Sequence, residues 1–153
     1  MVEGKVIALS VSKEKGVPKE NVKEVRILED FGIEGDAHAG PWHRQVSFLD
    51  TSTLEWMKTS VGRPLAFGEL AENVTTDVDL SKVEVGDMIE AGNCLFEVTQ
   101  IGKNCHHGCA IFQRVGKCEM RNRGIFTRVL KGGILKVGDP LKIIKRGPQD
   151  GQK

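Results

Sequence analysis

VEVGDMIEAG (83–92) and LKVGDPLKII (135–144) are two versions of one pattern, and they decide the fold class. In each, Val-Gly-Asp is followed by a run of residues typical of a β-strand. We interpret both as the same tight turn leading into a strand. Recurrent turns of this kind are common in barrels, so the repeat favours a β architecture and says nothing about chemistry.

Strand patterns continue on both sides of the repeats. CLFEVTQI (94–101) follows the turn Gly92–Asn93, which predicts a hairpin with the preceding DMIEA. The 18 glycines imply many tight turns. We therefore predict a mainly antiparallel, β-barrel-like fold with a few short helices. Further strands are predicted at 5–12, 22–29, 44–50, 124–130 and 140–145.

The clearest helix signal begins at Asp50, a typical N-cap residue, and stops at Gly62 and Pro64. Three residues supply its apolar side: Leu54, Trp56 and Met57. A second, weaker turn of helix is predicted within 67–80.

The length of 153 residues predicts a single domain, 1–153, with a core at about 4–145 and a frayed, polar C-terminal tail. The sequence contains no apolar run of about 18 residues, so no membrane-spanning helix is expected. The N-terminus lacks the pattern of a secretory signal, which predicts a cytoplasmic protein. In that compartment the four cysteines are expected to be thiols.

Two cysteines and two histidines lie together in NCHHGC (104–109). They are enough in number for a zinc site, and Cys118 could add a ligand, but a second CxxC or HxxxH is missing. A disulfide between Cys105 and Cys109 suits the expected compartment poorly. The third alternative is a reactive thiol with neighbours that tune it.

Cys109 has the context of a reactive thiol. It follows Gly108 and precedes AIFQRV, whose apolar spacing predicts a short helix. A cysteine at a helix N-terminus has a lowered pKa, so its thiolate could attack, carry sulfur or ligate a soft metal. Cys94, within a predicted strand, is better explained as a buried, inert cysteine.

The cysteine cluster lies in a basic part of the chain. Residues 101–136 carry eight lysines and arginines, Arg114 and Arg123 among them, against Glu119 alone. This net charge of +7 leaves −6 for the rest of the chain. A basic region around a thiol predicts an anionic ligand or a stabilised thiolate, and a merely solvated basic face is the alternative. Nucleic acid is not the expected ligand, because aromatic residues are sparse here.

A glycine-rich loop, GIEGDAHAGPWHRQ (32–45), is the second candidate for function. Glycines let the backbone approach a ligand closely. Asp36 and His38 could form a hydrogen-bonded pair, and His43 and Arg44 add further polar groups. The alternative is that Asp36 caps a turn and the histidines are surface groups.

The succession of motifs resembles the MOSC domain, the module named for the C-terminal part of molybdenum cofactor sulfurases. The resemblance covers roughly residues 4–145. The chain is similar in length to the small, stand-alone members of the family. It rests on the order of GIEGDAHAG, HRQVSFLD, GELAENVT, VGDMIEAG with LFEVTQIG, GCAIFQRVG and GIFTRVLKGGILKVGDPL.

The resemblance implies a barrel-like β fold and a functional cysteine. The family cysteine is proposed to carry sulfur as a persulfide, or it binds molybdenum of the pterin cofactor in relatives that reduce N-hydroxylated compounds. Cys109, followed by Ile111 and Gly116, fits the family pattern better than Cys105, which is assigned an auxiliary role. Gly108 replaces the proline that often precedes this cysteine. The expected cofactor-binding residues are Gly35, Asp36, His38, Arg44, Gln45, Asn73, Arg114 and Arg123.

Three functions stay open on this basis. The first is a sulfur carrier or molybdenum-cofactor-handling protein, in which Cys109 holds sulfur or ligates molybdenum. The second is a small molybdoenzyme that reduces N-hydroxylated compounds, and the third is a non-catalytic module that binds the cofactor or its oxyanion. The cofactor is expected in its molybdenum or tungsten form. The larger sulfurases use a separate pyridoxal-phosphate domain for which this chain has no room. Sulfur is therefore expected from a cysteine desulfurase or another donor, and the other expected partners are cofactor-biosynthesis proteins or molybdoenzymes.

Overall fold

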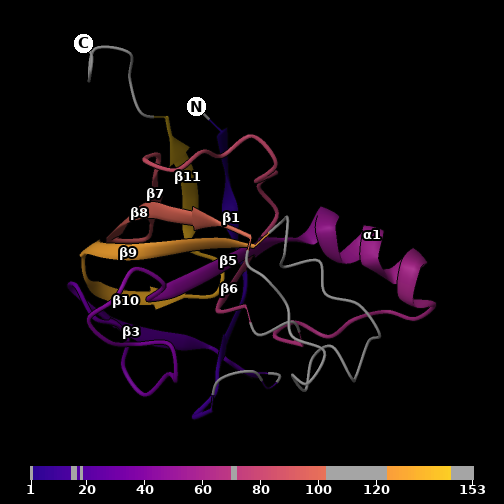
Figure 1. The fold of residues 1–153 in the computed structure, drawn as a ribbon, viewed down its shortest axis with the longest axis horizontal. Coiled ribbons are helices and arrows are strands. Elements are labelled where there is room, and N and C mark those ends of the chain that lie inside the picture. The colour runs from indigo at the N-terminus through magenta and orange to yellow at the C-terminus, as the bar shows by residue number, and fades with distance from the viewer. Residues whose placement is uncertain (1, 15–16, 18, 70–71, 103–123, 146–153) are drawn as a thin grey trace.

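The computed structural model describes residues 2–14, 17, 19–69, 72–102 and 124–145. This part of the chain is mainly β with one short helix, as the sequence predicts (Figure 1). Its elements are β1 (Val2–Val11), β2 (Glu20–Val22), β3 (Glu24–Leu28), β4 (Gly32–Ile33), β5 (Val46–Asp50), α1 (Thr51–Val61), β6 (Val74–Thr76), β7 (Met88–Ala91), β8 (Cys94–Ile101), β9 (Ile125–Lys131), β10 (Gly133–Lys136) and β11 (Pro140–Ile144).

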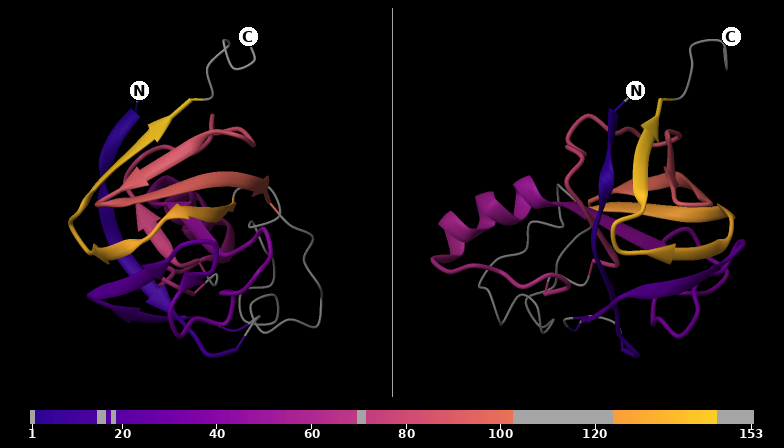
Figure 2. Two further views of the ribbon diagram at one scale, coloured as in Figure 1. Left: turned by 90° about the vertical axis from the view of Figure 1, so that its left-hand side faces the viewer. Right: turned by 180° about the vertical axis from the view of Figure 1, so that it is seen from behind.

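Seven strands close into a barrel in the order β11-β7-β8-β9-β5-β6-β1, and β1 pairs with β11 to complete the ring. The pairing of β5 with β6 is parallel, and the other pairings of the ring are antiparallel. Parallel neighbours cannot be joined by a tight hairpin. The connection from β5 to β6 contains α1, which projects from the side of the barrel (Figure 2).

β1 closes the barrel by pairing with three partners along its length. Residues 2–5 pair with β11, residues 6–9 with β6, and residues 9–11 with β2. The register shifts between Val6 and Ala8, which marks a β-bulge. A bulge bends a strand and increases its twist, so one long strand can serve successive partners around the barrel.

The two Val-Gly-Asp repeats form the same turn, as predicted. Gly86 and Gly138 have φ angles of 99° and 94°, a left-handed conformation that favours glycine. The carboxylate of Asp87 accepts a hydrogen bond from the Glu84 amide at 2.8 Å, and that of Asp139 accepts one from the Lys136 amide at 2.9 Å. The turns lead into β7 and β11, which are antiparallel neighbours in the wall of the barrel.

A smaller sheet, β10-β3-β4, packs against the barrel and shares its core. Phe48 and Phe96 meet edge to face near the centre, with ring centroids 5.1 Å apart. Four apolar residues of the small sheet belong to the same buried cluster: Val25, Ile27, Ile33 and Leu135. The small sheet matters for function because the glycine loop begins within β4.

The predicted helix is confirmed as α1. Asp50 is its N-cap and accepts a hydrogen bond from the Thr53 amide at 2.9 Å, and Gly62 ends the helix in a left-handed conformation. Leu54 and Met57 are buried as expected, whereas Trp56 is 44% exposed. The prediction that Trp56 belongs to the apolar side of the helix is therefore wrong.

The second helix predicted within 67–80 is wrong in the part that the structure describes. Residues 67–69 form a turn, and Val74–Thr76 form β6. Val-Thr-Thr is a β-branched run that fits a strand. It has neighbours on both sides in β1 and β5, so sheet pairing replaces helical hydrogen bonds.

Asp50 provides a test of how the helix is attached to the barrel, because its second carboxylate oxygen accepts the Leu80 amide at 2.8 Å. Asp50→Ala should lower the free energy of unfolding by about 2–4 kcal/mol, since a lost N-cap costs about 1 kcal/mol and an unsatisfied buried amide about 1–3 kcal/mol. Asp50→Asn keeps a capping oxygen and is the control. Urea unfolding measures both, and equal stability of the two variants would contradict this account.

Candidate functional site

The glycine loop (32–45) is held to the barrel by Gln45. The Gln45 side-chain amide donates to the Gly40 carbonyl at 2.9 Å and to Asp30 at 3.2 Å, while its oxygen accepts the Val129 amide of β9 at 2.9 Å. Gly32 has no room for a side chain, because a Cβ there would lie 2.9 Å from the Gln45 carbonyl. Gln45 therefore shapes the loop, and its expected contact with a ligand stays a prediction.

Asp36 forms the polar centre of the loop. One carboxylate oxygen accepts the Ser12 amide at 3.0 Å and the Lys19 ammonium at 2.8 Å, and the other accepts the His38 amide at 3.0 Å. Burial alone would raise the pKa of Asp36, but the hydrogen bonds from His38 and Lys19 and the Lys19 charge hold it well below its usual range. Asp36 is thus a buried carboxylate anion at neutral pH.

His38, Trp42 and Arg44 form a layered group that we call the stack. The His38 and Trp42 rings are nearly parallel, with centroids 6.4 Å apart, and the Trp42 indole N–H donates to the His38 carbonyl at 2.7 Å. The Arg44 guanidinium carbon lies 4.6 Å from the Trp42 ring centroid and 5.8 Å from that of Phe126. Such cation–π contacts hold an arginine in place without consuming its N–H donors.

Arg44 also carries an unused donor. Its Nε atom is buried and has no hydrogen-bond partner among the described residues. A buried N–H without a partner is costly in a folded protein and is found where another group can supply the acceptor. The arginine is therefore suited to bind an oxygen of an anion.

The loop is attached to the end of β8 through His43. The His43 Nε2 atom lies 2.8 Å from the Gln100 side-chain oxygen, and the Thr99 hydroxyl donates to the His43 carbonyl. The Gln100 amide donates to the Gly102 carbonyl at 2.7 Å, and the Gly102 amide donates to the Gly124 carbonyl at 2.6 Å. The glycine loop therefore lies beside the two residues that flank 103–123.

Cys105 and Cys109, Arg114 and Arg123 fall within residues 103–123, outside the part that the structure describes. The same is true of His106, His107 and Cys118. Within the described residues there is no group of three or more His, Cys, Asp or Glu residues that could hold a metal ion. The zinc alternative thus concerns residues that the structure does not describe.

Asn73 is fully buried between the strands. Its side-chain oxygen accepts the Ser47 amide at 3.0 Å, and its amide group donates to the Ser10 carbonyl at 3.1 Å. It thereby links β1, β5 and the start of β6, so these atoms serve the barrel. Its expected role in cofactor binding stays a prediction.

Gly35 lines a pocket of about 520 Å³ between the glycine loop and the end of β1. The other lining residues are Val11, Ser12, Lys13, Glu14, Val17 and Glu20. Ser12 and Gly35 are also neighbours of Asp36, through the Ser12 amide hydrogen bond and along the chain. The pocket thus adjoins the polar centre of the loop, where expected ligand-binding residues lie.

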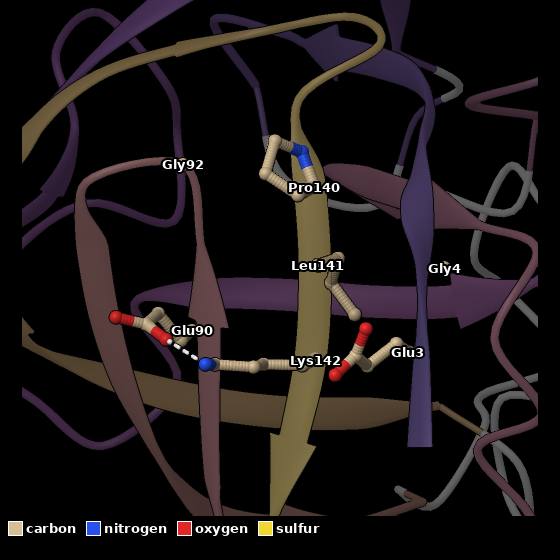
Figure 3. A pocket seen from close by; sticks show the side chains of 7 residues that line it. All are labelled: Glu3, Gly4, Glu90, Gly92, Pro140, Leu141 and Lys142. Atoms are coloured by element: carbon tan, nitrogen blue, oxygen red, sulfur yellow. Dashed lines mark ion pairs between the residues drawn. The ribbon is translucent and has the colours of Figure 1, made fainter. Parts of the chain in front are cut away.

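Two other hollows contain none of the residues of the stack. One, of about 280 Å³, is lined by residues at the start of α1, by residues within 80–83, by Ile101 at the end of β8 and by Ile125 at the start of β9. The other, of about 250 Å³, lies over β1, β7 and β11, where Lys142 is turned toward Glu90 at 3.1 Å (Figure 3). The hollow in Figure 3 contains none of the expected ligand-binding residues.

Lys19 is a residue of the site that was not among those expected from the sequence. Its side chain is fully buried against Asp36 and Ser12. No local signal distinguishes it from an exposed lysine.

Among the described residues, no helix is long and apolar enough to cross a membrane.

Comparisons with known proteins agree with this architecture. The MOSC domain family model matches residues 35–142. The fold is similar to the YuaD protein from Bacillus subtilis (TM-score 0.79, 16% identity, covering 96% of this chain and 100% of that one). It is also similar to YiiM from Geobacillus stearothermophilus (TM-score 0.69, 23% identity, covering 94% of this chain and 76% of that one). YiiM from Escherichia coli is similar as well (TM-score 0.68, 17% identity, covering 96% of this chain and 71% of that one). No curated protein sequence matches the chain.

Cys94 is fully buried in β8, and its burial, together with the nearby negative charge of Asp139, raises the pKa of its thiol to about 11 despite Lys131. At pH 8 the side chain is therefore a protonated, inaccessible thiol. We expect iodoacetamide to modify Cys94 slowly in the native protein and rapidly in urea, as measured by peptide mass spectrometry. Equal rates in the two conditions would show that Cys94 is accessible.

Proposed function

The chain belongs to the MOSC domain family, and on that premise we propose that it carries sulfur or handles the molybdenum cofactor through Cys109. Cys105 is auxiliary in this proposal. The glycine loop binds the anionic part of the ligand through Arg44, close to the segment that carries the thiol. The protein acts in the cytoplasm.

The attachment of the glycine loop to the end of β8 is the observation that supports this proposal most directly. His43 contacts Gln100, and Gln100 in turn holds Gly102, immediately before the segment with Cys105 and Cys109. Gly124, immediately after that segment, accepts the Gly102 amide. The glycine loop therefore lies beside Gly102 and Gly124, the residues between which the cysteine-bearing segment begins and ends.

The residues present fit a phosphate-bearing pterin cofactor. Arg44 offers a buried donor without a partner among the described residues, and its guanidinium is held beside the Trp42 ring. Charge-assisted hydrogen bonds from arginine to phosphate are short and strong. Arg114 and Arg123 would add positive charge, and Cys109 would offer a soft thiolate ligand to molybdenum or tungsten. When bound, the cofactor supplies redox chemistry at its metal.

Sulfur carriage requires only the thiol and a donor. The Cys109 thiolate attacks the outer sulfur of a donor persulfide, such as that of a cysteine desulfurase, and forms a new S–S bond. The donor's S–S bond breaks, and the donor leaves as a thiolate. The sulfur changes carrier without net oxidation, so no external oxidant is needed. Cofactor-biosynthesis proteins or molybdoenzymes are the acceptors.

The two other functions differ in what remains bound to the protein. A small molybdoenzyme that reduces N-hydroxylated compounds would retain molybdenum in proportion to the chain. A non-catalytic module would bind the cofactor or its oxyanion without transfer or turnover. Elemental analysis with intact mass spectrometry of protein purified without oxygen distinguishes these from a persulfide carrier that holds no metal.

Cys109→Ser should abolish sulfur loading and molybdenum retention, because serine is neither a persulfide carrier nor a soft ligand. Cys105→Ser is the matched control and should retain most of both. Cys109 should also react with iodoacetamide faster at neutral pH than Cys94. If Cys105→Ser loses both properties and Cys109→Ser keeps them, Cys105 is the functional thiol. If all four single cysteine variants keep both, the thiol mechanism fails.

Arg44→Ala should lower the phosphate and molybdenum retained per chain about tenfold or more, since hydrogen bonds to charged groups contribute about 1.5–3 kcal/mol. Arg123→Ala should act in the same direction. Lys142→Ala is the control, because Lys142 lies on β11, away from the glycine loop, and forms an ion pair with Glu90 at 3.1 Å. Unchanged retention in both Arg44→Ala and Arg123→Ala would favour a merely solvated basic face.

A further inference from the structure

Lys19 is a buried lysine in an unusual position, just before β2. Its side chain has no exposure, and its ammonium lies 2.8 Å from Asp36 and 3.1 Å from the Ser12 hydroxyl. Burying two opposite charges costs desolvation energy that their attraction repays only in good geometry, and apolar replacements are often as stable. A buried ion pair is therefore weak evidence for stability, and another role for these charges has to be considered.

The ion pair determines how Asp36 meets His38. Lys19 and the Ser12 amide both bind one carboxylate oxygen, Oδ1, of Asp36. The other oxygen, Oδ2, accepts the His38 backbone amide at 3.0 Å and lies 3.7 Å from Nδ1 of the His38 ring. This separation is longer than a hydrogen bond, so the carboxylate acts on the ring through its charge, which favours a proton on the nearer nitrogen of the neutral imidazole. The arrangement therefore favours a His38 ring with its proton on Nδ1 and its lone pair on Nε2.

Lys19 is itself fixed from a distant part of the chain. Its backbone amide donates to the Gly68 carbonyl at 2.8 Å, and the Gly68 amide donates to Glu72 at 2.8 Å. Gly68 has a φ angle of 89°, and a Cβ there would lie 2.6 Å from the Lys19 carbonyl. The close approach of the two backbones thus restricts the position of the Lys19 backbone. Lys19 contacts Asp36, Asp36 contacts His38, and the His38 ring is in turn stacked on Trp42.

We propose that Lys19 is a positioning residue of the site. It holds Asp36 so that His38 presents Nε2 as a hydrogen-bond and proton acceptor to N–H, O–H or S–H groups of the bound ligand. This inference rests on the proposed function, because the site is the same one. It adds a residue from outside the glycine loop and assigns a direction to the histidine. Residues that orient a ligand-binding histidine typically change affinity or activity about 10- to 100-fold when replaced.

The test compares a neutral pair with a matched ion pair elsewhere. Lys19→Met with Asp36→Asn removes both charges together, so neither is left buried alone. The control is Lys145→Met with Asp87→Asn, because Lys145 pairs with the buried Asp87 at 2.5 Å in the turn before β7, away from the glycine loop. Long-range ¹H–¹⁵N correlation spectra of the full-length protein report the protonated nitrogen of His38, and elemental analysis reports molybdenum per chain after anaerobic purification.

In the wild type and in the control Lys145→Met with Asp87→Asn we expect a neutral His38 with its proton on Nδ1. In the double variant of Lys19 and Asp36 we expect mixed tautomers and about tenfold less molybdenum, with the β fold retained by circular dichroism. A wild-type His38 protonated on Nε2 overturns the inference, and this measurement needs no variant to fold. A double variant of Lys19 and Asp36 with unchanged tautomer and molybdenum content overturns it as well. If the wild type holds no molybdenum, the cofactor function fails, while the His38 spectrum still decides the role of Lys19.

Discussion

The pairing of β1 with β11 is the constraint on which the rest of the structure depends. It joins the two ends of the strand order into a ring, so that neither strand is left as an open edge beside the core. β1 then continues past β6 and ends next to Ser12, whose backbone amide binds Asp36. The strand that closes the barrel thus also supports the polar centre of the glycine loop, which links barrel closure directly to the site.

The loop is held to the rest of the protein by polar contacts of its side chains. Gln45 binds it to β9, Asp36 binds it to the end of β1 and to Lys19, and His43 binds it to β8. Each contact connects the loop to a different segment, so its backbone is defined from several sides. Polar contacts of this kind favour one conformation, because alternatives would break several of them at once. A loop held from several sides suits a site that must present donors and acceptors in fixed directions.

Local patterns predicted most of the described strands, the helix cap at Asp50 and the two matching turns, because alternation, capping and positive-φ glycines are properties of neighbouring residues. They failed at β6, where pairing with β1 and β5 decided the conformation. The burial of individual polar side chains was harder to predict from the sequence, because it depends on segments that are distant along the chain. Lys19 resembles any turn lysine in the sequence, and nothing in the sequence shows that the Gln45 side chain bonds to Gly40 and Val129.

The closing strand pair also has a consequence for synthesis of the protein on the ribosome. β1 is synthesised before its ring partner β11, which lies near the other end of the described chain. Contacts of such long sequence separation delay folding, because the intervening chain must be ordered or looped before they form. The nascent chain therefore cannot complete the ring co-translationally until β11 has emerged. During that interval the free edges of β1 and β7 are the surfaces that chaperones would have to shield from aggregation.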